Sequence, residues 1–545
     1  GNIAIGYQSM QNANSSAFHR NTAIGYQTMA NVGSNGPDDT VALGYQAGYN
    51  LRNGDKNVII GSGAGYNIRD TDENVAIGYQ ALYTLESLGG DGYDHGQSRS
   101  TAVGAYALHL AQDREEVYAA NTAVGYNAGY RGGSSINFGG NVYVGNRAGY
   151  WHDAGNSVFI GNGAGYNYMS GSYNVAVGSG AMRGFTTSSA IGQDNVVIGN
   201  NAGRHWKSSF SSVVVGHDAG YEGAGSRDNT LVGNAAGYNM SGSQQYNTYV
   251  GSAAGYGKNL ASSNVAVGAS ALGGTDWKDL SSVSGDWSGN TAVGRRAGQY
   301  AANSFSTFFG YEAGARAAGS SNNFIGYYAG RGTTSSAPYT NGNNNIGIGR
   351  EALESFRSGS NNIALGRDVM TSQQDGEYNV AMGYHALSGA GSVFGNTTSH
   401  NVAIGQQAMF KHGQGDYNIA IGRAALYDDV SGSFNVAIGR EAGSNNVSGN
   451  NNVFIGYQSA FGSHGNSPAQ NTGVGFRSLY SVSTGIHNVA LGYDSGKGIT
   501  SGPRNTTIGS YAGDTITTGE QNILIGHSAD VDAGAGSNRI GIGYN

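Results

Sequence analysis

Residues 418–460 decide the fold, because they repeat one phrase three times: NIAIGRAALYDDVSGSFNVAIGREAGSNNVSGNNNVFIGYQSA. The copies start at Asn418, Asn435 and Asn452, 17 residues apart. Each begins with Asn, a β-branched residue, Ala or an aromatic residue, a bulky aliphatic residue and Gly. A short, fixed period of this kind predicts a repeat architecture, and it takes precedence over any single motif.

The same phrase recurs along the whole chain. Numbered by the glycine that ends the phrase, which we call the anchor glycine, 30 copies lie between Gly6 and Gly543. Fifteen of the 29 spacings are 17 residues, and the longest are 26. We therefore predict one continuous repeat domain, 1–545, in which the unit is 16–17 residues and longer copies carry surface insertions. The longest insertions are 84–99 and 273–289.

The composition excludes several classes of protein. Charged residues are 12% of the chain, about half of the roughly 25% that is typical of globular domains. A net charge of −7 without a basic stripe argues against nucleic-acid binding. The absence of Cys excludes disulfides and thiolate metal sites. No apolar run is long enough for a membrane helix. Because the chain starts inside a copy, we expect it to be a piece of a longer protein.

The phrase itself predicts a short β-strand. The residue before the anchor glycine is always a bulky apolar one, such as Ile421, and the residue two positions earlier is nearly always Val, Ile or Thr. These two share one face of a strand, and the residue between them points to the other face. That middle residue is never charged, so both faces avoid charge, which is typical of parallel strands. We therefore predict an all-β, parallel β-solenoid of about 30 coils.

Two features of the phrase predict structural ladders. Asn opens 24 of the 30 copies, and stacked amides can both donate and accept hydrogen bonds. The alternative is that Asn serves only as a turn residue. The anchor glycine permits a positive φ or a close backbone approach. The residues that we expect to form these ladders are Asn418, Asn435, Asn452, Gly422, Gly439 and Gly456.

The energetics of so thin a coil predict an oligomer. Three or four apolar side chains per copy contribute about 1.5–3 kcal/mol each. This barely offsets about 1 kcal/mol or more of backbone entropy per residue. We expect several chains to lie side by side with the second apolar face, the one that carries the alternate Ala and Phe residues, turned inward. A homotrimer is the arrangement that we favour, although the residues alone do not separate it from other oligomers.

The phrase NxAIGxxA resembles the head repeat of trimeric autotransporter adhesins. Copies such as 42–49 (ALGYQAGY) and 76–83 (AIGYQALY) are similar to the Tyr-rich repeats of phage tail fibres. The resemblance covers the whole chain. It implies a trimer of left-handed β-rolls that projects from a surface and binds a host. The repeat is longer than in most adhesin heads, and the neck, stalk and anchor of an adhesin are absent from this sequence.

No motif predicts catalysis. His152-Asp153 and His217-Asp218 suggest ligands, but we interpret them as surface residues beside turns. The stretch 255–259 (GYGKN) lacks the Ser or Thr of a phosphate loop. Acidic pairs for glycoside hydrolysis could lie in the insertions; the candidates are Asp91, Asp94, Asp276, Asp279 and Asp286. We interpret these as solvated loop acids, and we expect no enzyme activity, no cofactor and no metal ion.

Aromatic residues near the insertions are candidate receptor contacts, because loops on a rigid scaffold often carry binding residues. The candidates, with one acidic neighbour, are Tyr93, Asp94, Trp151, Trp206, Trp277 and Trp287. The alternative is that they cap the coil or pack on neighbouring chains. The regularly placed tyrosines favour stacking ladders over binding.

The leading hypothesis is a trimeric, non-enzymatic fibre segment of a phage virion, which acts as a spacer and contacts a host-surface glycan or protein. One alternative is the head of a bacterial surface adhesin. Another is a polysaccharide depolymerase built on a β-solenoid. An ice-binding solenoid would need a regular Thr array, and Thr is irregular here.

Overall fold

The structure is a computed structural model. It describes the chain except for residues 14–17, 34–35, 86–98, 111–119, 132–138, 169, 185–191, 224, 241–243, 258–261, 275–286, 302, 333–341, 373–374, 390–396, 464, 533 and 545. Its residues form two compact units. Unit 1 comprises Gly1–Ser270 and Gly274–Asp286, and unit 2 comprises Ala271–Gly273 and Trp287–Asn545.

The described residues contain 35 strands and no helix, and thirty of the strands have three residues, one for each copy of the phrase. In unit 1 they are β1 (Ile3–Ile5), β2 (Thr22–Ile24), β3 (Val41–Leu43), β4 (Val58–Ile60), β6 (Val75–Ile77), β8 (Thr101–Val103), β9 (Thr122–Val124), β10 (Val142–Val144), β11 (Val158–Ile160), β12 (Val175–Val177), β13 (Val196–Ile198), β15 (Val213–Val215), β17 (Thr230–Val232), β19 (Thr248–Val250) and β20 (Val265–Val267). In unit 2 they are β21 (Thr291–Val293), β22 (Thr307–Phe309), β23 (Asn323–Ile325), β24 (Ile346–Ile348), β25 (Ile363–Leu365), β26 (Val380–Met382), β27 (Val402–Ile404), β28 (Ile419–Ile421), β29 (Val436–Ile438), β30 (Val453–Ile455), β31 (Thr472–Val474), β32 (Val489–Leu491), β33 (Thr506–Ile508), β34 (Ile523–Ile525) and β35 (Ile540–Ile542).

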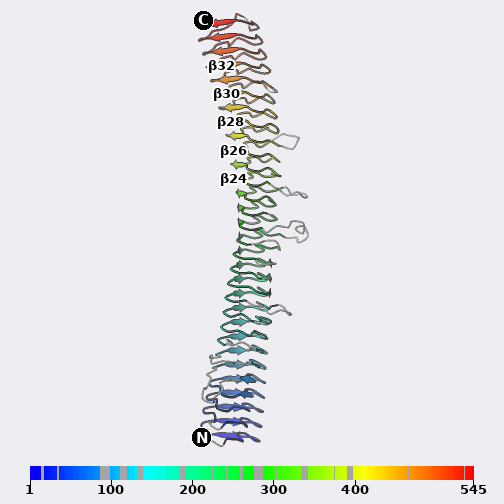
Figure 1. Cartoon of the computed structure of the whole chain (residues 1–545), viewed down its shortest axis with the longest axis vertical. Helices are drawn as coiled ribbons and strands as arrows, with labels where there is room; N and C mark the ends of the chain where they lie inside the picture. The colour runs from blue at the N-terminus through cyan, green and yellow to red at the C-terminus, as the bar shows by residue number, and fades with distance from the viewer. Residues whose placement is uncertain are drawn as a thin grey trace. The chain divides into compact units, whose positions relative to one another are not determined.

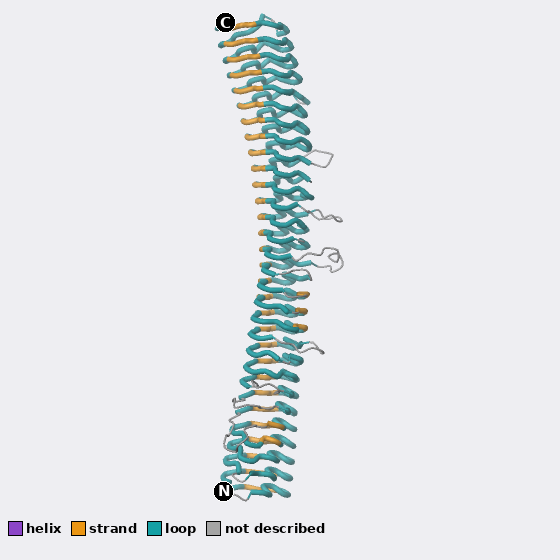
Figure 2. The backbone as a smooth tube through the Cα atoms, in the orientation of Figure 1, coloured by secondary structure: helices purple, strands orange, loops and turns teal. Residues whose placement is uncertain are grey.

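Within each unit, consecutive strands of this set pair in parallel. Ile419–Ile421 of β28, for example, lies residue for residue against Val436–Ile438 of β29. Between paired strands the chain completes one circuit of a coil, which we call a rung. Figure 1 shows the labelled strands of unit 2 lying one above the next, and Figure 2 shows loops completing each rung. This is the parallel β-solenoid that the sequence predicts.

Two-residue strands form secondary ladders in unit 1. β14 (His205–Trp206), β16 (Glu222–Gly223) and β18 (Asn239–Met240) make a parallel three-stranded sheet on another side of three successive rungs. β5 (Asn67–Ile68) pairs with β7 (Thr84–Leu85) in the same way. Each rung therefore gains a second backbone contact in these places.

The two faces of the strands are the reverse of the sequence-based prediction. The middle residue of every three-residue strand except β1 and β35 is buried inside the coil. Ala420 and Phe159 are both 0% exposed, whereas Ile419 and Ile421 are 37% and 36% exposed. The alternate Ala and Phe residues therefore fill the coil, and the Val and Ile residues form the face that lies outside it. The prediction that neighbouring chains cover the Ala and Phe face is therefore wrong.

Two positions share the interior of a rung. In many rungs a bulky middle residue is accompanied by a glycine four residues after the anchor glycine, as with Phe159 and Gly165. A Cβ atom on Gly165 would lie 2.6 Å from the Phe159 ring. Where the middle residue is Ala420, the same position holds the fully buried Leu426. Either position can fill the space because protein interiors are close-packed.

The anchor glycines are required by the stacking of rungs. Gly439 has a φ of +133°, and a Cβ atom there would lie 2.5 Å from the carbonyl oxygen of Gly456 in the next rung. No L side chain tolerates both the conformation and the contact. The same close approach of glycine to glycine recurs from Gly422 to Gly439.

The opening asparagines form the amide ladder that the sequence favours. The Asn435 N–H donates to Asn418 Oδ1 at 2.9 Å, and the Asn452 N–H donates to Asn435 Oδ1 at 3.0 Å. The Asn435 Nδ2 group also donates to the Gly449 carbonyl at 2.8 Å, three residues before the next opening asparagine, Asn452. All these side chains are buried. The ladder thus satisfies backbone groups that water cannot reach.

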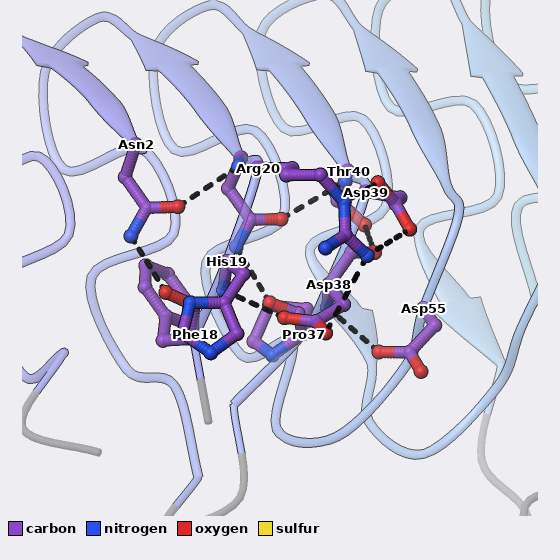
Figure 3. A network of polar contacts seen from close by, with 10 residues as sticks. Asn2, Phe18, His19, Arg20, Pro37, Asp38, Asp39, Thr40 and Asp55 are labelled. Atoms are coloured by element: carbon purple, nitrogen blue, oxygen red, sulfur yellow. Dashed lines mark hydrogen bonds and ion pairs between the residues drawn. The ribbon is translucent and has the colours of Figure 1, made fainter. Parts of the chain in front are cut away.

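A second ladder, which the sequence analysis missed, runs two residues before the first. In this ladder a side-chain oxygen of one rung accepts a hydrogen bond from a backbone N–H group of the rung before it. The His19 N–H donates to Asp38 Oδ1 at 2.6 Å and the Asp38 N–H donates to Asp55 Oδ1 at 2.7 Å, as Figure 3 shows. Ser399 and Asp416 repeat the arrangement in unit 2. The signal was present as a recurrent Ser, Asp or Asn two positions before the opening Asn.

Candidate interaction face

The most extensive feature on the outside of each coil is a face formed by the first and third residues of the thirty strands, which we call the aliphatic face. These residues are Val, Ile, Leu, Thr, Met or Phe, with Asn323 as the exception. None is charged, and all are half-buried or exposed. Ile198 and Ile348 are 39% and 40% exposed. An uncharged and largely apolar exposed surface is typical of protein interaction sites.

Two columns of side chains border the aliphatic face. The entry column contains the residue two positions before each strand, such as Tyr417, and the exit column contains the residue two positions after it, such as Arg423. Unlike the face, both columns carry charges. In unit 1 the entry column holds Arg20 and Asp39, which are joined by an Nη2–Oδ2 hydrogen bond of 2.8 Å (Figure 3). The columns therefore differ between rungs while the face stays apolar.

In unit 2 the entry column contains a stack of four exposed rings. Tyr378, His400, Tyr417 and Phe434 lie with successive ring centroids 5.1, 4.6 and 5.2 Å apart. Tyr417 and Phe434 are 51% and 56% exposed. Because the rings stack on one another, they present their edges to solvent.

The exit column of unit 2 contains five exposed arginines: Arg295, Arg350, Arg367, Arg423 and Arg440. Three of them are followed by an acid that pairs with them, as Glu441 does with Arg440 at 3.0 Å. Burial of Glu441 acts to raise its pKa, but hydrogen bonds from Gln458 and Arg440 hold the pKa below its ordinary value. Arg423 is followed by Ala424, and its guanidinium makes no hydrogen bond, ion pair or ring contact within the described residues.

Tyrosines also stack outside unit 1. Tyr49, Tyr66 and Tyr83 lie in successive rungs with ring centroids 5.1 and 5.0 Å apart. Burial raises the pKa of Tyr66, and neighbouring tyrosines add to the effect. The Tyr66 phenol therefore stays neutral at physiological pH. The stacks use the ring faces that a bound sugar would need, which supports a structural role.

The structure places the candidate tryptophans differently from one another. Trp206 in β14 is fully buried, and its Nε1–H donates to the Gly220 carbonyl at 2.6 Å. Trp287 is 6% exposed. Neither can contact a receptor from these positions, so that interpretation is wrong for both. Trp151 is half-buried, with the Arg131 guanidinium 4.7 Å above its ring.

The remaining candidates lie outside the described residues. These are Tyr93, Asp94 and Trp277 among the receptor contacts, and Asp91, Asp94, Asp276, Asp279 and Asp286 among the acids. The insertions in which they lie are to be judged by experiment.

His152 is a second correction, because it is buried rather than on the surface. Its Nδ1 lies 2.8 Å from the Tyr143 hydroxyl and its Nε2 lies 3.2 Å from the Gly171 carbonyl. Burial lowers the pKa of His152 to about 4. The imidazole is therefore neutral, and it packs and makes hydrogen bonds inside the coil. His217, by contrast, is exposed as expected.

A buried polar column occupies unit 2 seven residues after successive anchor glycines. It contains His412, Asp429 and Asn446, where other rungs have residues such as Ile499 and Ile516. Asp429 Oδ1 accepts from the Gly432 N–H at 2.7 Å, and Asn446 Oδ1 accepts from the Gly449 N–H at 2.8 Å.

Burial has opposite effects on the two titratable groups of this column. It raises the pKa of Asp429 to about 8 and lowers the pKa of His412. Both groups are therefore neutral in the fold at neutral pH. They are sealed inside the coil and cannot reach a substrate.

The described residues contain no group of three His, Asp or Glu side chains that could hold a metal ion. In the same part of the chain, no helix is long and apolar enough to cross a bilayer. The sequence matches no known protein family, and no curated protein is similar to it.

Proposed function

We propose that the chain is a structural segment of a trimeric fibre that projects from a phage virion and holds host-contacting parts away from the particle. The observation that carries the proposal is the aliphatic face, which continues without a charged residue through every rung of both units. Exposed apolar surface of this length needs a partner.

The partner that fits best is another copy of the same chain. A matching surface must be apolar, as long as the face, and spaced by one strand separation of about 4.8 Å. The chain itself has a surface with that period. Copies related by rotation about a common axis can all turn their aliphatic faces toward the axis.

The number of copies and the biological setting come from the resemblance of the repeat. Tail-fibre and adhesin-head repeats imply three copies and a left-handed coil. We therefore place the protein in the virion, with the insertions contacting a host-surface glycan or protein. The head of a bacterial surface adhesin is the alternative, because its repeat shares the NxAIGxxA phrase. In both settings the segment is a scaffold and not an enzyme.

Two experiments test the setting. Antibodies raised against the purified chain should label fibres on phage particles in negatively stained preparations, and the encoding gene should lie among virion genes. A gene beside an outer-membrane anchor, with antibody labelling of bacterial cells instead, would move the assignment to the adhesin head. Release of reducing ends from host polysaccharide by the purified chain would contradict a purely structural role.

A further inference from the structure

The two columns that border the aliphatic face have complementary chemistry in unit 2. The rungs of β28 and β29 have an aromatic residue in the entry column and an arginine in the exit column. These pairs are Tyr417 with Arg423, and Phe434 with Arg440. All four side chains are exposed. Within one chain the members of a pair lie at opposite ends of a strand and cannot meet.

Rotational symmetry brings opposite edges together. In a ring of parallel copies each contact is heterologous, so the exit edge of one copy faces the entry edge of the next. If the copies are level, the residues that meet belong to the same rung. This step rests on the proposed trimer, because a single chain offers no surface for either edge.

We propose that Tyr417 and Phe434 of one copy pack against Arg423 and Arg440 of the next copy, rung against rung, and so fix the axial register of the trimer. The aliphatic face cannot fix the register by itself, because its residues repeat almost unchanged from rung to rung. A shift of one rung would leave the apolar packing nearly intact. In the level alignment both arginines meet a Tyr or Phe ring, whereas a shift of one rung sets one of them against His400 or Asn451 instead.

The available hydrogen-bonding groups support this pairing. Arg423 is exposed, and among the described residues its guanidinium makes no hydrogen bond, ion pair or ring contact, although its charge acts on Glu441. The ring stack presents the edges and phenol oxygens of Tyr378 and Tyr417 toward solvent, and a phenol oxygen accepts hydrogen bonds from a guanidinium. Phe434 is 56% exposed. Within its own chain Arg440 pairs with Glu441 at 3.0 Å and lies 5.5 Å from the Tyr457 ring centroid, so its contact with Phe434 of the next copy adds packing and not a new ion pair.

Disulfide trapping tests the register directly, because the chain has no cysteine of its own. The test variant is Tyr417→Cys with Arg423→Cys. A disulfide needs a Cα–Cα distance of about 4.4–6.8 Å. The three-residue strand between the two positions alone spans about 10 Å, so the bond cannot close within one chain. Both side chains are exposed, and circular dichroism should show an unchanged fold.

The expected product after oxidation is a covalent trimer on non-reducing gels, formed in most of the protein and lost on reduction. Each single-cysteine variant should stay at the mass of one chain. A matched control, Tyr417→Cys with Arg350→Cys, places the cysteines four rungs apart, about 19 Å along the axis, and should not link.

Other outcomes would overturn the inference and separate it from the proposed function. If the native mass is three chains but Tyr417→Cys with Arg423→Cys does not link, the edges do not meet as proposed. Linking by Phe434→Cys with Arg423→Cys instead would show a register shifted by one rung, which also contradicts the inference. A ladder that stops at two chains would rule out a ring of three. A native mass of one chain would contradict the proposed trimer, and with it the proposed function.

Discussion

The rungs of β10 and β11 in unit 1 and those of β27 and β28 in unit 2 fill the same interior in opposite ways. In unit 1 the strand supplies the bulk, with Phe159 inside and glycine at position 165. In unit 2 the strand supplies Ala420 and the following turn supplies Leu426. The comparison shows that the two positions share one interior space and that either of them can fill it. It also identifies pairs of substitutions that should destabilise the coil when made singly but not when made together.

The largest expected effect comes from removing the Phe159 ring from the interior of the β11 rung. Phe159→Ala should lower the local opening free energy of that rung by about 3–5 kcal/mol, because it leaves a cavity. Adding Gly165→Leu should recover most of the loss, since it recreates the Ala and Leu arrangement of unit 2. Gly165 has a φ of +61° and Leu426 a φ of +49°, so the backbone accepts leucine. Hydrogen exchange of peptides that cover the rung measures each value.

Gly165→Leu alone is the control for this pair, because it crowds the intact Phe159 ring. We expect a loss of about 1–3 kcal/mol. If the double variant is no more stable than the worse single variant, the two positions do not share a volume, and the comparison fails.

The next-largest effect distinguishes a glycine that lies against the next rung, Gly439, from one that does not, Gly163. Gly439→Ala should cost about 2–3 kcal/mol, because the conformation is unsuited to a side chain and the Cβ atom meets the backbone of the next rung. Gly163→Ala is the matched control. Gly163 has a φ of +62°, and the nearest atom to its Cβ is 4.0 Å away. Hydrogen exchange should show a loss of only about 1 kcal/mol for Gly163→Ala, from the left-handed conformation alone, and equal losses at both positions would be inconsistent with the close stacking.

The Asn ladder differs between the same regions and gives a third test. In unit 1 Ser157 occupies the ladder position, and the Asn174 N–H donates to its Oγ at 3.2 Å. In unit 2 Asn435 occupies it. Asn435→Ala should cost about 1–3 kcal/mol, because it leaves the Asn452 N–H without its acceptor and removes one of the two donors to the Gly449 carbonyl, the other being Asn446 Nδ2. Asn435→Ser should cost less, as Ser157 demonstrates. Equal exchange rates in the two variants would argue against the ladder.

The smallest effect concerns pH and compares adjacent rungs of unit 2. Burial raises the pKa of Asp429 to about 8, from an unfolded value of about 3.9. The folded state holds the proton between these values, so the stabilising contribution is complete below about pH 4 and is lost as the pH rises toward 8. Asp429→Asn should remove this decline, because Asn446 makes the equivalent hydrogen bond one rung later.

The measurement is the difference in opening free energy between Asp429→Asn and the unchanged chain at several pH values. It should grow by at least about 1.4 kcal/mol between pH 5 and pH 8 in favour of the variant. Asn446→Asp should introduce a similar decline one rung away. A difference that does not vary with pH would mean that the Asp429 carboxyl is not buried.

Much of the fold could be predicted from the sequence because the repeat is nearly constant. The period, the strand, the parallel pairing, the anchor glycines and the Asn ladder all follow from residues at fixed spacing. The orientation of the strand did not follow. In a three-residue strand, alternation shows that Ile419 and Ile421 share a face, but not which face lies inside, and alanine is compatible with both. The exchange of bulk between Phe159 and Gly165 contained the missing information.

The buried tryptophan and histidine were missed for a related reason. Trp206 and His152 lie seven residues after their anchor glycines, a position that holds Ile68 and Ile499 in other rungs. Comparing that position across copies would have shown it to be internal. The exposure of each residue was instead predicted from its neighbours in sequence, which are typical of surface loops. The contacts expected in the insertions depend on residues that do not repeat, so periodicity could not predict their structure.

The central claim is that the aliphatic face is covered by other copies of the chain. Sedimentation equilibrium of the purified protein at micromolar concentration tests it most directly. The account predicts three times the chain mass of 55.9 kDa. A single chain mass, with Ile419 and Ile421 open to water in a folded and soluble protein, would contradict it.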